Sequence, residues 1–283
     1  MTSPGSRWSD LDRPPLSARA LRPAMIWPDG LWTQLEIVES TGSTNADLAE
    51  AARAGRASAG TVLVAEEQTS GRGRLGRGWS APPRSGLFFS VLLKTEPEVT
   101  TERLSWLPLL AGVATAAAVA RAAGVDTALK WPNDLLVTVE GEERKCGGIL
   151  AERTGHGTVV LGIGVNVSLR ADELPVPHAG SLLLAGAVST DRDPLLRAVL
   201  RSLAEWYTRW LAACGDPAAS GVLDAYVAGC ATLDRPVRAE LPGGGELRGT
   251  ATALDGEGRL VVTAADGTRH PLAAADIVHL RTT

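Results

Sequence analysis

The sequence predicts an α+β protein, with a mixed sheet flanked by helices and a small β-barrel after it. Strand-like and helix-like runs alternate irregularly, and some neighbouring strands are close enough to form hairpins. Hydrophobic residues make up 45% of the 283 residues, which is enough for a packed core. After Asp234 short strands are separated by the turns PGGG, DGEG and DG. We therefore expect an N-terminal extension (1–34), a main domain (35–232) and a small β domain (233–283).

The first third of the chain supplies an extension and the first strands. Residues 1–34 contain five prolines and predict an extended arm with at most one short helix. A strand over 34–39 ends at the polar cluster STGSTN, where Ser43 or Thr44 could cap a helix over 46–53 that ends at Gly55. Strands are predicted over 61–68 and 87–93, on either side of the loop SGRGRLGRGW.

The middle of the chain predicts one buried helix, a hairpin and two further helices. The alanine-rich run 103–123 predicts a helix that stops at Gly124. Its charge-free stretch is shorter than the ~20 strongly apolar residues of a membrane span, so we interpret it as a core helix. Strands over 135–139 and 146–153 should pair across the turn EGEER. A strand is expected over 158–167 and helices over 194–213 and 221–228.

Composition excludes several classes of protein. A net charge of −4 argues against a protein that binds nucleic acid through a broadly basic surface. The three cysteines form no CxxC pair, so we expect neither a disulfide framework nor a structural zinc site. The N-terminus has no apolar signal segment. We expect a cytoplasmic protein with no nucleic-acid or membrane partner. Lysine occurs only three times among 28 basic residues, so each lysine is worth attention.

The glycine- and arginine-rich loop carries the first functional signal. Gly71, Gly73 and Gly76 have the G-x-G-x-x-G spacing, but Gly78 and two prolines follow, so no helix can start there as a dinucleotide site requires. The loop also lacks the Lys-Ser or Lys-Thr that ends a Walker A loop. Glycines and guanidinium groups favour close approach to a small polyanion. The alternative is a solvated surface hairpin. The guanidinium groups belong to Arg72, Arg74 and Arg77.

A second set of polar residues lies near this loop in the sequence. Ser43, Thr44, Asn45 and Gln68 offer both donors and acceptors in short side chains. Such a set suits a neutral head that resembles a urea or an amide. The alternative is that Ser43 or Thr44 only caps the helix.

Five motifs in order then identify a family. STN, GRGRLGRGW, LKWPNDLL, KCGGILAE and GIGVNV resemble the biotin–protein ligases, and the resemblance spans roughly residues 35–283. It implies a class II aminoacyl-tRNA synthetase/biotin ligase-like domain followed by a C-terminal SH3-like β domain. Because 1–34 is too short for a winged helix, the chain resembles the monofunctional class. One departure is Cys146-Gly147, where many members have Leu-Ala; it leaves Lys145 in place.

The resemblance implies a two-step reaction. Biotin and MgATP give biotinyl-5′-AMP and pyrophosphate, and a lysine of a biotin carboxyl carrier domain then takes the biotinyl group and releases AMP. ATP, Mg²⁺ and biotin are thus the expected small molecules. The chemistry of the residues agrees, because an anionic carboxylate must meet a polyanion, and cations have to offset the repulsion. The unstable acyl-adenylate also requires a site that closes.

The resemblance also assigns residues to roles. Those expected to bind the ureido end of biotin are Ser43, Thr44, Asn45 and Gln68. Those expected to close over biotin and the adenylate phosphate are Arg72, Gly73 and Arg74, with Arg72 and Arg74 catalytic. Lys145 is expected beside the reacting carboxylate and α-phosphate as the main catalytic group. The remaining nucleotide contacts are expected from Arg77 near the polyphosphate, Trp79 anchoring the loop, Asn133 and Asp134 organising nucleotide and magnesium, and Gly164 and Asn166 against the adenosine.

Plain structural alternatives remain for several residues. Lys145 could be a solvated charge opposite Glu142 or Glu143. Lys130 could pair with Asp134 and be structural. The remaining interpretations are a core role for Trp106 and Trp131, a β-bulge at Gly162 and Gly164, and a plain buried thiol rather than a reactive one at Cys146.

Other functions compete with the ligase. A lipoate-type ligase on the same fold is the nearest alternative, but that group lacks the GRGRLGRGW loop. A biotin-responsive DNA-binding regulator is disfavoured by residues 1–34. An inactive biotin-binding scaffold is disfavoured by the retained loop and Lys145.

Overall fold

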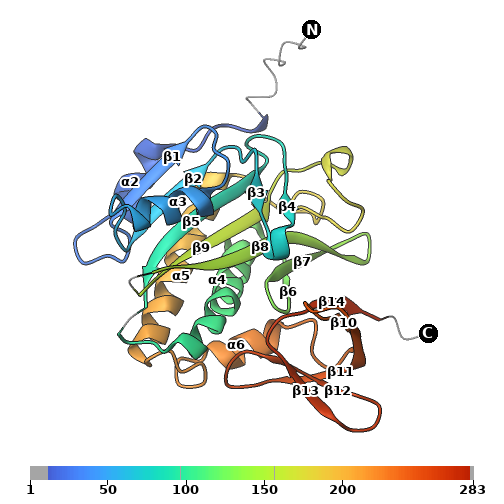
Figure 1. Ribbon diagram of the computed structural model, residues 1–283. Coiled ribbons are helices and arrows are strands. Elements are labelled where there is room, and N and C mark those ends of the chain that lie inside the picture. Colours follow the sequence, from blue (N-terminus) through green and yellow to red (C-terminus); the bar gives the residue numbers. More distant parts are fainter. Residues whose placement is uncertain (1–11, 96, 156, 281–283) are drawn as a thin grey trace.

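The computed structural model describes residues 12–95, 97–155 and 157–280 (Figure 1). Seven strands in these residues form a mixed sheet in the order β1-β2-β5-β9-β8-β7-β6. β1 and β2 are parallel, and the other neighbours are antiparallel. The six strands predicted over 34–167 are confirmed, with β8 beginning four residues earlier than expected, and β6 is a seventh strand that the sequence did not predict. Their bounds are β1 (Gln34–Val38), β2 (Thr61–Ala65), β5 (Gly86–Lys94), β6 (Ala128–Lys130), β7 (Asp134–Val139), β8 (Glu142–Gly155) and β9 (Thr158–Asn166).

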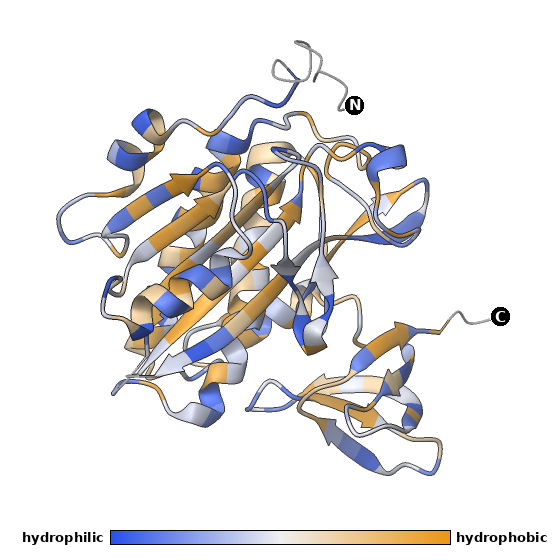
Figure 2. Ribbon diagram, turned by 45° about the horizontal axis from the view of Figure 1, so that its top comes forward, coloured by the Kyte–Doolittle hydropathy of each residue, from blue (hydrophilic) through white to orange (hydrophobic). Residues whose placement is uncertain are grey.

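Helices cover both faces of this sheet (Figure 1). On one face lie α4 (Trp106–Ala123), α5 (Arg192–Ala212) and α6 (Val222–Gly229). Figure 2 shows that the central strands are largely hydrophobic, as a sheet buried on both faces requires. The opposite face carries α3 (Thr44–Arg53), which packs Leu48 and Ala49 against Leu92 and Val160. That face is only partly covered by α3, and the remainder holds the cavity described below.

Helix α4 is the predicted buried helix. A 3₁₀ turn (Thr101–Ser105) leads into it, and Gly124, with φ +66°, ends it in the left-handed conformation. By length and composition alone Thr101–Ala123 is apolar enough to cross a membrane, yet 67% of its apolar window is buried inside the protein. Trp106 and Leu110 are fully buried in the main core. The helix is therefore a core element of the fold.

The residues after 235 form the predicted second β unit. Its five strands in the described residues are antiparallel in the order β13-β12-β11-β10-β14. Trp106 Nε1 and Trp131 Nε1 each donate a hydrogen bond of 2.9 Å to the unit, at Gly256 O and Gly258 O. The two tryptophans are core residues, as predicted, and they also hold the small domain on the main one. The strand bounds are β10 (Pro236–Glu240), β11 (Glu246–Leu254), β12 (Leu260–Thr263), β13 (Arg269–Leu272) and β14 (Asp276–His279).

The described part of the N-terminal extension packs on the main domain. It contains one short helix, α2 (Ala18–Met25), with Leu21 and Met25 fully buried. A buried ion pair between Arg192 and Glu66 (2.6 Å) anchors the preceding residues, because Glu66 also accepts a hydrogen bond from the Leu16 amide (2.6 Å). The extension therefore contributes to the main core from residue 16 onward; residues 1–11 lie outside the described part.

The hairpin that carries Lys145 differs from the prediction in two ways. Its turn is Glu140-Gly141, with φ +52° and +80°, a two-residue turn of the kind that matches strand twist. The expected five-residue turn EGEER is therefore wrong, and residues 142–145 belong to β8. A bulge interrupts the β7–β8 register where Leu135 pairs with Gly147 and Leu136 with Lys145. The bulge lies at Cys146, and not at Gly162 or Gly164, where pairing on both sides is continuous.

Candidate active site

A cavity of about 830 Å³ lies on the α3 face of the sheet, under the glycine-rich loop and beside the small domain. All fourteen residues that the sequence proposed line it, although they come from segments far apart in the chain. Further lining residues that the sequence did not suggest come from the loop 175–179 and from β10 and β14. The fourteen are Ser43, Thr44, Asn45, Gln68, Arg72, Gly73, Arg74, Arg77, Trp79, Asn133, Asp134, Lys145, Gly164 and Asn166.

One end of the cavity is lined by neutral polar groups at the start of α3. Ser43 occupies the N-cap position, but its side chain makes no capping hydrogen bond within the described residues. The Thr44 amide donates to Gln68 Oε1 (2.9 Å), which caps the helix from another strand end. Ser43 is thus the N-cap residue by position, as predicted, but in this part of the structure its side chain does not form the capping hydrogen bond, and both Ser43 and Thr44 line the cavity.

Asn45 is held from several sides beneath these residues. Its Nδ2 donates to Glu152 Oε2 (2.8 Å) and to Leu150 O (3.2 Å), and its Oδ1 accepts from the Ser90 hydroxyl (2.6 Å). A Cβ on Gly162 would lie 2.1 Å from Asn45 Oδ1, so glycine is required there for close approach. Ser90 could have been suspected as the one hydroxyl in an apolar strand; Glu152 carried no signal.

The glycine-rich loop is a short hairpin folded over the cavity. β3 (Gly71–Arg72) pairs with β4 (Gly78–Trp79), and a 3₁₀ turn (Arg74–Gly76) joins them, so no dinucleotide-type helix follows. The Trp79 ring lies against two glycines of the sheet, where added Cβ atoms on Gly148 and Gly164 would come within 3.2 and 3.1 Å. Trp79 thus anchors the loop, and the missing side chains of both glycines make room for it.

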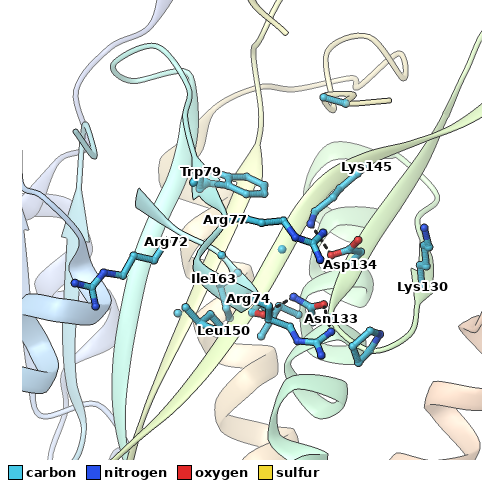
Figure 3. Close-up of a pocket in the computed structure, with 18 of the residues that line it drawn as sticks. Arg72, Arg74, Arg77, Trp79, Lys130, Asn133, Asp134, Lys145, Leu150 and Ile163 are labelled. Carbon is cyan, nitrogen blue, oxygen red and sulfur yellow. Dashed lines mark hydrogen bonds and ion pairs between the residues drawn. The ribbon is translucent and has the colours of Figure 1, made fainter. Parts of the chain in front are cut away.

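The arginines of this loop point in different directions (Figure 3). Arg74 and Arg77 extend toward Asn133, Asp134 and Lys145, whereas Arg72 points to the opposite side. Arg74 Nη1 donates a long hydrogen bond to Asn133 Oδ1 (3.4 Å), and burial lowers the pKa of its guanidinium.

Arg77 forms an ion pair with Asp276 of β14. This hydrogen-bonded pair raises the pKa of Arg77 and lowers that of Asp276. The small domain therefore reaches the loop directly.

Lys145 projects into the cavity because of the bulge at Cys146. The extra residue shifts the alternation of side chains, so that Lys145 and Gly148 face the same side, 3.5 Å from Nζ to the position of a Cβ on Gly148. Lys145 Nζ lies 2.6 Å from Asp134 Oδ1 and 5.7 Å from the centre of the Trp79 ring. Pairing with Glu142 or Glu143 is therefore the wrong interpretation, and Glu143 instead binds Arg235 (2.7 Å).

Lys130 is a half-buried neighbour of this pair. Burial lowers the pKa of its ammonium, and Asp134 partly opposes that effect. Among the described residues, the ion pair of Asp134 is with Lys145 and not with Lys130, so the proposed Lys130–Asp134 bridge is wrong. Lys130 therefore adds positive potential to the cavity but does not form an ion pair with the carboxylate of Asp134.

Two buried polar atoms that border the cavity have no hydrogen-bond partner within the described residues. Asn166 Nδ2 donates to Gly180 O (2.9 Å), which fixes its amide, while its Oδ1 has no hydrogen-bond partner in the described residues. Trp79 Nε1 is also without a partner in this part of the chain. Because unpaired buried polar groups are costly, these atoms suit a ligand that donates to Asn166 Oδ1 and accepts from Trp79. An aromatic amine such as adenine offers both.

Reactive thiols and a protein-only metal cage are not features of this cavity. Cys146 is fully buried, and burial raises its pKa to about 12, so it is the plain thiol that was expected. The described residues hold no cluster of three or more His, Cys, Asp or Glu side chains that could bind a metal ion. Any cation here would need ligands from a bound substrate.

Comparisons with known proteins agree with the geometry. The biotin/lipoate A/B protein ligase family matches residues 37–168, and the biotin protein ligase C-terminal domain matches residues 232–280. The chain is 41% identical to the biotin–[acetyl-CoA-carboxylase] ligase of Mycobacterium tuberculosis, over 95% of this chain and 97% of that protein. It is 30% identical to the bifunctional ligase/repressor of Bacillus subtilis, over 86% of this chain and 72% of that one.

Solved structures give the same result for the fold. The biotin protein ligase from Aquifex aeolicus in complex with biotin and ATP superposes with a TM-score of 0.71 at 27% identity, over 88% of this chain and all of that chain (100%). The α+β fold with a small C-terminal β domain is therefore confirmed.

Proposed function

The chain belongs to the biotin protein ligase family, and from that membership we propose that its cavity activates biotin with ATP and passes the biotinyl group to a protein lysine. The observation that carries this proposal is the arrangement within one cavity: neutral donors and acceptors at the α3 end, and Lys145, Arg74 and Arg77 at the other. A urea and a carboxylate at opposite ends of one ligand match that arrangement.

In the first step the carboxylate of biotin attacks the α-phosphorus of ATP. Two anions have to approach, so the protein must supply positive charge at the point of attack. We assign this role to the ammonium of Lys145, with Arg74 behind it. In this step Lys145 Nζ either exchanges its ion pair with Asp134 for contacts with the substrates or keeps both. The loop of residues 71–79, anchored by Trp79, excludes water from the adenylate.

Arg72 needs a different assignment from the other loop arginines. The family resemblance proposes that it closes over biotin, yet it points away from Lys145 (Figure 3). Because Arg72 lines the cavity and sits in a loop of glycines, it contacts biotin by a rearrangement of the loop. The Gly73 amide donates to Arg77 O (2.7 Å). In this proposal the rearrangement of the loop breaks that hydrogen bond.

In the second step a lysine of the acceptor protein attacks the acyl carbon, and AMP leaves. We propose that this acceptor is a biotin carboxyl carrier domain, which the name of the Mycobacterium tuberculosis relative supports by pointing to acetyl-CoA carboxylase. Val176 lines the cavity and is exposed, and Leu75 is exposed in the glycine-rich loop; we propose that these apolar side chains contact the acceptor protein.

Magnesium fits the cavity only together with ATP. Mg²⁺ is commonly held by one or two carboxylates plus substrate phosphates. Asp134 supplies a carboxylate beside Lys145, and Asn133 supplies an amide oxygen that Arg74 already contacts. We propose that these two residues would hold the ion together with the polyphosphate, and that it would supply positive charge to offset the negative charge of the phosphates. The adenine is assigned to Asn166 and Trp79, whose polar atoms lack partners in the described residues, with Gly164 beneath.

The alternative functions fit less well. A lipoate-type ligase would not need the donors and acceptors at Thr44 and Gln68, which suit a urea. The alignment covers 97% of the Mycobacterium tuberculosis ligase and 72% of the bifunctional Bacillus subtilis protein. A reducing, cytoplasmic location is supported by three cysteines that are all free.

Transfer of labelled biotin tests the proposal. Protein, MgATP, labelled biotin and a biotin carboxyl carrier domain should yield an acid-stable label on the carrier and release AMP and pyrophosphate. Carrier whose target lysine is changed to arginine should remain unlabelled. Labelling by lipoate but not by biotin, or no label at all, would overturn the proposal.

A further inference from the structure

A network of hydrogen-bonded polar groups, buried except for the half-exposed Glu152, lies behind the urea-binding end of the cavity. It runs from Glu152 on β8 through Asn45 and Ser90 to Thr44. The distances are 2.8 Å from Asn45 Nδ2 to Glu152 Oε2, 2.6 Å between Ser90 Oγ and Asn45 Oδ1, and 2.7 Å between Ser90 Oγ and Thr44 Oγ1. Ser90 is fully buried, and among the described residues neither Ser90 nor Glu152 lines the cavity.

Counting the available protons determines which group donates and which accepts in each hydrogen bond of this network. A carboxylate such as Glu152 can only accept, and Leu150 O also only accepts, so the Asn45 amide must turn its Nδ2 toward them. Asn45 Oδ1 then faces Ser90 and requires a donor. Ser90 has one hydroxyl proton, which is therefore used on Asn45.

The direction of these hydrogen bonds fixes the hydroxyl of Thr44. Since Ser90 has used its proton, Thr44 cannot accept from it and instead donates, either to Ser90 Oγ or to Gln68 Oε1 (3.2 Å). In both arrangements the Thr44 proton stays within the protein. A lone pair of Thr44 Oγ1 therefore faces the cavity and accepts from a ligand N–H.

Gln68 supplies the opposite polarity beside it. Its Oε1 is occupied by the Thr44 amide (2.9 Å), so its Nε2 lies on the other side of the group, near Gly71. The cavity end therefore presents an acceptor and a donor side by side. A cyclic urea has an N–H next to a carbonyl oxygen and matches this pair.

We propose that Glu152 and Ser90 are positioning residues that set the specificity for a urea, by fixing Thr44 as an acceptor. This inference rests on the proposed function, and it names residues that do not touch the substrate. Their contribution is to hydrogen-bond polarity, so their loss should change which ligands bind, and not only how tightly biotin binds.

The test compares biotin with cyclic carbamate analogues, in which one ring N–H or the other is replaced by oxygen. The shape is retained, but the donor becomes an acceptor that meets the lone pair of Thr44. Wild-type protein should prefer biotin strongly in kcat/KM for adenylate formation. In Ser90→Ala the Thr44 hydroxyl loses one of its two protein partners and keeps only the longer contact with Gln68 Oε1 (3.2 Å), so its proton can turn to the ligand oxygen at lower cost. The ratio of kcat/KM for biotin to kcat/KM for the carbamate that the wild-type protein uses less well should then fall by about tenfold or more.

Substitutions at Glu152 give an independent arm. Glu152→Leu removes the shorter of the two acceptor contacts of Asn45 Nδ2 and leaves only Leu150 O (3.2 Å), so the orientation of the Asn45 amide is held less firmly. The preference for biotin should fall in the same direction. Glu152→Gln keeps an acceptor oxygen for Asn45 and should retain the wild-type preference. Glu36→Leu, an exposed carboxylate on β1, is the matched control and should change nothing.

The outcomes separate the two proposals. Failure of the wild-type protein to adenylate biotin would overturn the proposed function itself. Normal adenylation by wild type, with biotin and carbamate falling by the same factor in Ser90→Ala and Glu152→Leu, would show a merely structural role and overturn this inference. Thermal unfolding of each variant identifies any that does not fold, and the Glu152 pair then decides the question alone.

Discussion

The two proposed ends of the cavity satisfy their polar groups in opposite ways: the urea end around Thr44, Asn45 and Gln68, and the phosphate end around Arg74, Arg77 and Lys145. At the urea end Asn45 is almost fully buried, and its hydrogen bonds are all made before any ligand arrives. At the phosphate end the charges are partly exposed and neutralise one another, as Lys145 does with Asp134 and Arg77 with Asp276. Fixed groups give selectivity for a neutral head, whereas ion pairs can be exchanged for the charges of a substrate.

This contrast extends to the supporting structure. The urea end is built from α3, β5 and β8 of one domain, and close approach at Gly162 holds Asn45 in place. The phosphate end is assembled from the loop, β7, β8 and the small domain. Mutations at the first end should therefore act on biotin binding, and mutations at the second on ATP binding and on the chemical step.

The largest effect is expected at Lys145. Lys145→Ala removes the ammonium beside the reacting groups and should lower the rate of adenylate formation by about 10²–10³-fold. Lys145→Arg should also fail, because Asp134, Trp79 and Gly148 enclose a compact ammonium and leave the wider guanidinium badly directed. Pyrophosphate release reports the step. Near-normal release by Lys145→Arg would show that any cation suffices.

The next effect tests the rigid end. Gly162→Ala places a Cβ where Asn45 Oδ1 lies, so Asn45 must move, and the KM for biotin should rise by about 100-fold. The KM for ATP should change little. Gly42→Ala is the matched control, because a Cβ there meets nothing within 4 Å and should leave both constants unchanged. An equal rise in both constants for Gly162→Ala would remove the distinction between the two ends.

A smaller effect is expected at Arg77. Its side chain is 58% exposed, so its interaction with the polyphosphate is screened by water. Arg77→Ala should raise the KM for ATP by about tenfold and leave the KM for biotin unchanged. Asp276→Asn should change the KM for ATP by less, because the phosphates bring their own charge to Arg77. An unchanged KM for ATP in Arg77→Ala would remove Arg77 from the phosphate site.

The sequence predicted the site residues that lie in local motifs, and missed those that the fold brings in from distant segments. Thr44, Arg74 and Lys145 were proposed because each lies in a motif that resembles the biotin–protein ligases, and all three line the cavity. Asp276 was missed because it is 199 residues from Arg77, and no local pattern marks it. Glu152 acts only through Asn45, a contact that the pairing of α3 with the sheet creates.

The direction of Lys145 shows the same limit. The sequence placed Lys145 immediately before a strand, and could not give the side of the sheet that it faces. That side depends on the single extra residue at Cys146, which breaks the two-residue alternation. The N-terminal extension is a further case, because its prolines predicted an arm, whereas its buried Leu21 and Met25 depend on contacts with distant elements.

The smallest predicted effect concerns how the small domain is attached at the phosphate end. His279 of β14 lies between Thr232 (3.1 Å) and Glu143 (3.4 Å), and Arg235 also approaches its Nδ1 (3.5 Å). Burial is the main cause that lowers the pKa of His279 below 6.5; the charges of Lys130 and Arg235 add to it, and Glu143 opposes it. The folded protein thus favours the neutral imidazole. The contribution of neutral His279 to the free energy of unfolding is complete above pH 6.5. It declines as the pH falls below that value, because the unfolded chain then takes up a proton more readily than the folded protein.

Thermal unfolding at pH 7.5 and 5.5 isolates this contribution. The wild-type melting temperature should fall between the two, and His279→Gln, which keeps a neutral polar group but cannot titrate, should fall by less. The difference between the two proteins is the quantity that matters, because other groups titrate equally in both. His270→Gln on β13, an imidazole whose neighbours differ, is the control and should behave as wild type. Equal losses in His279→Gln and wild type would show that the imidazole does not link the small domain to pH.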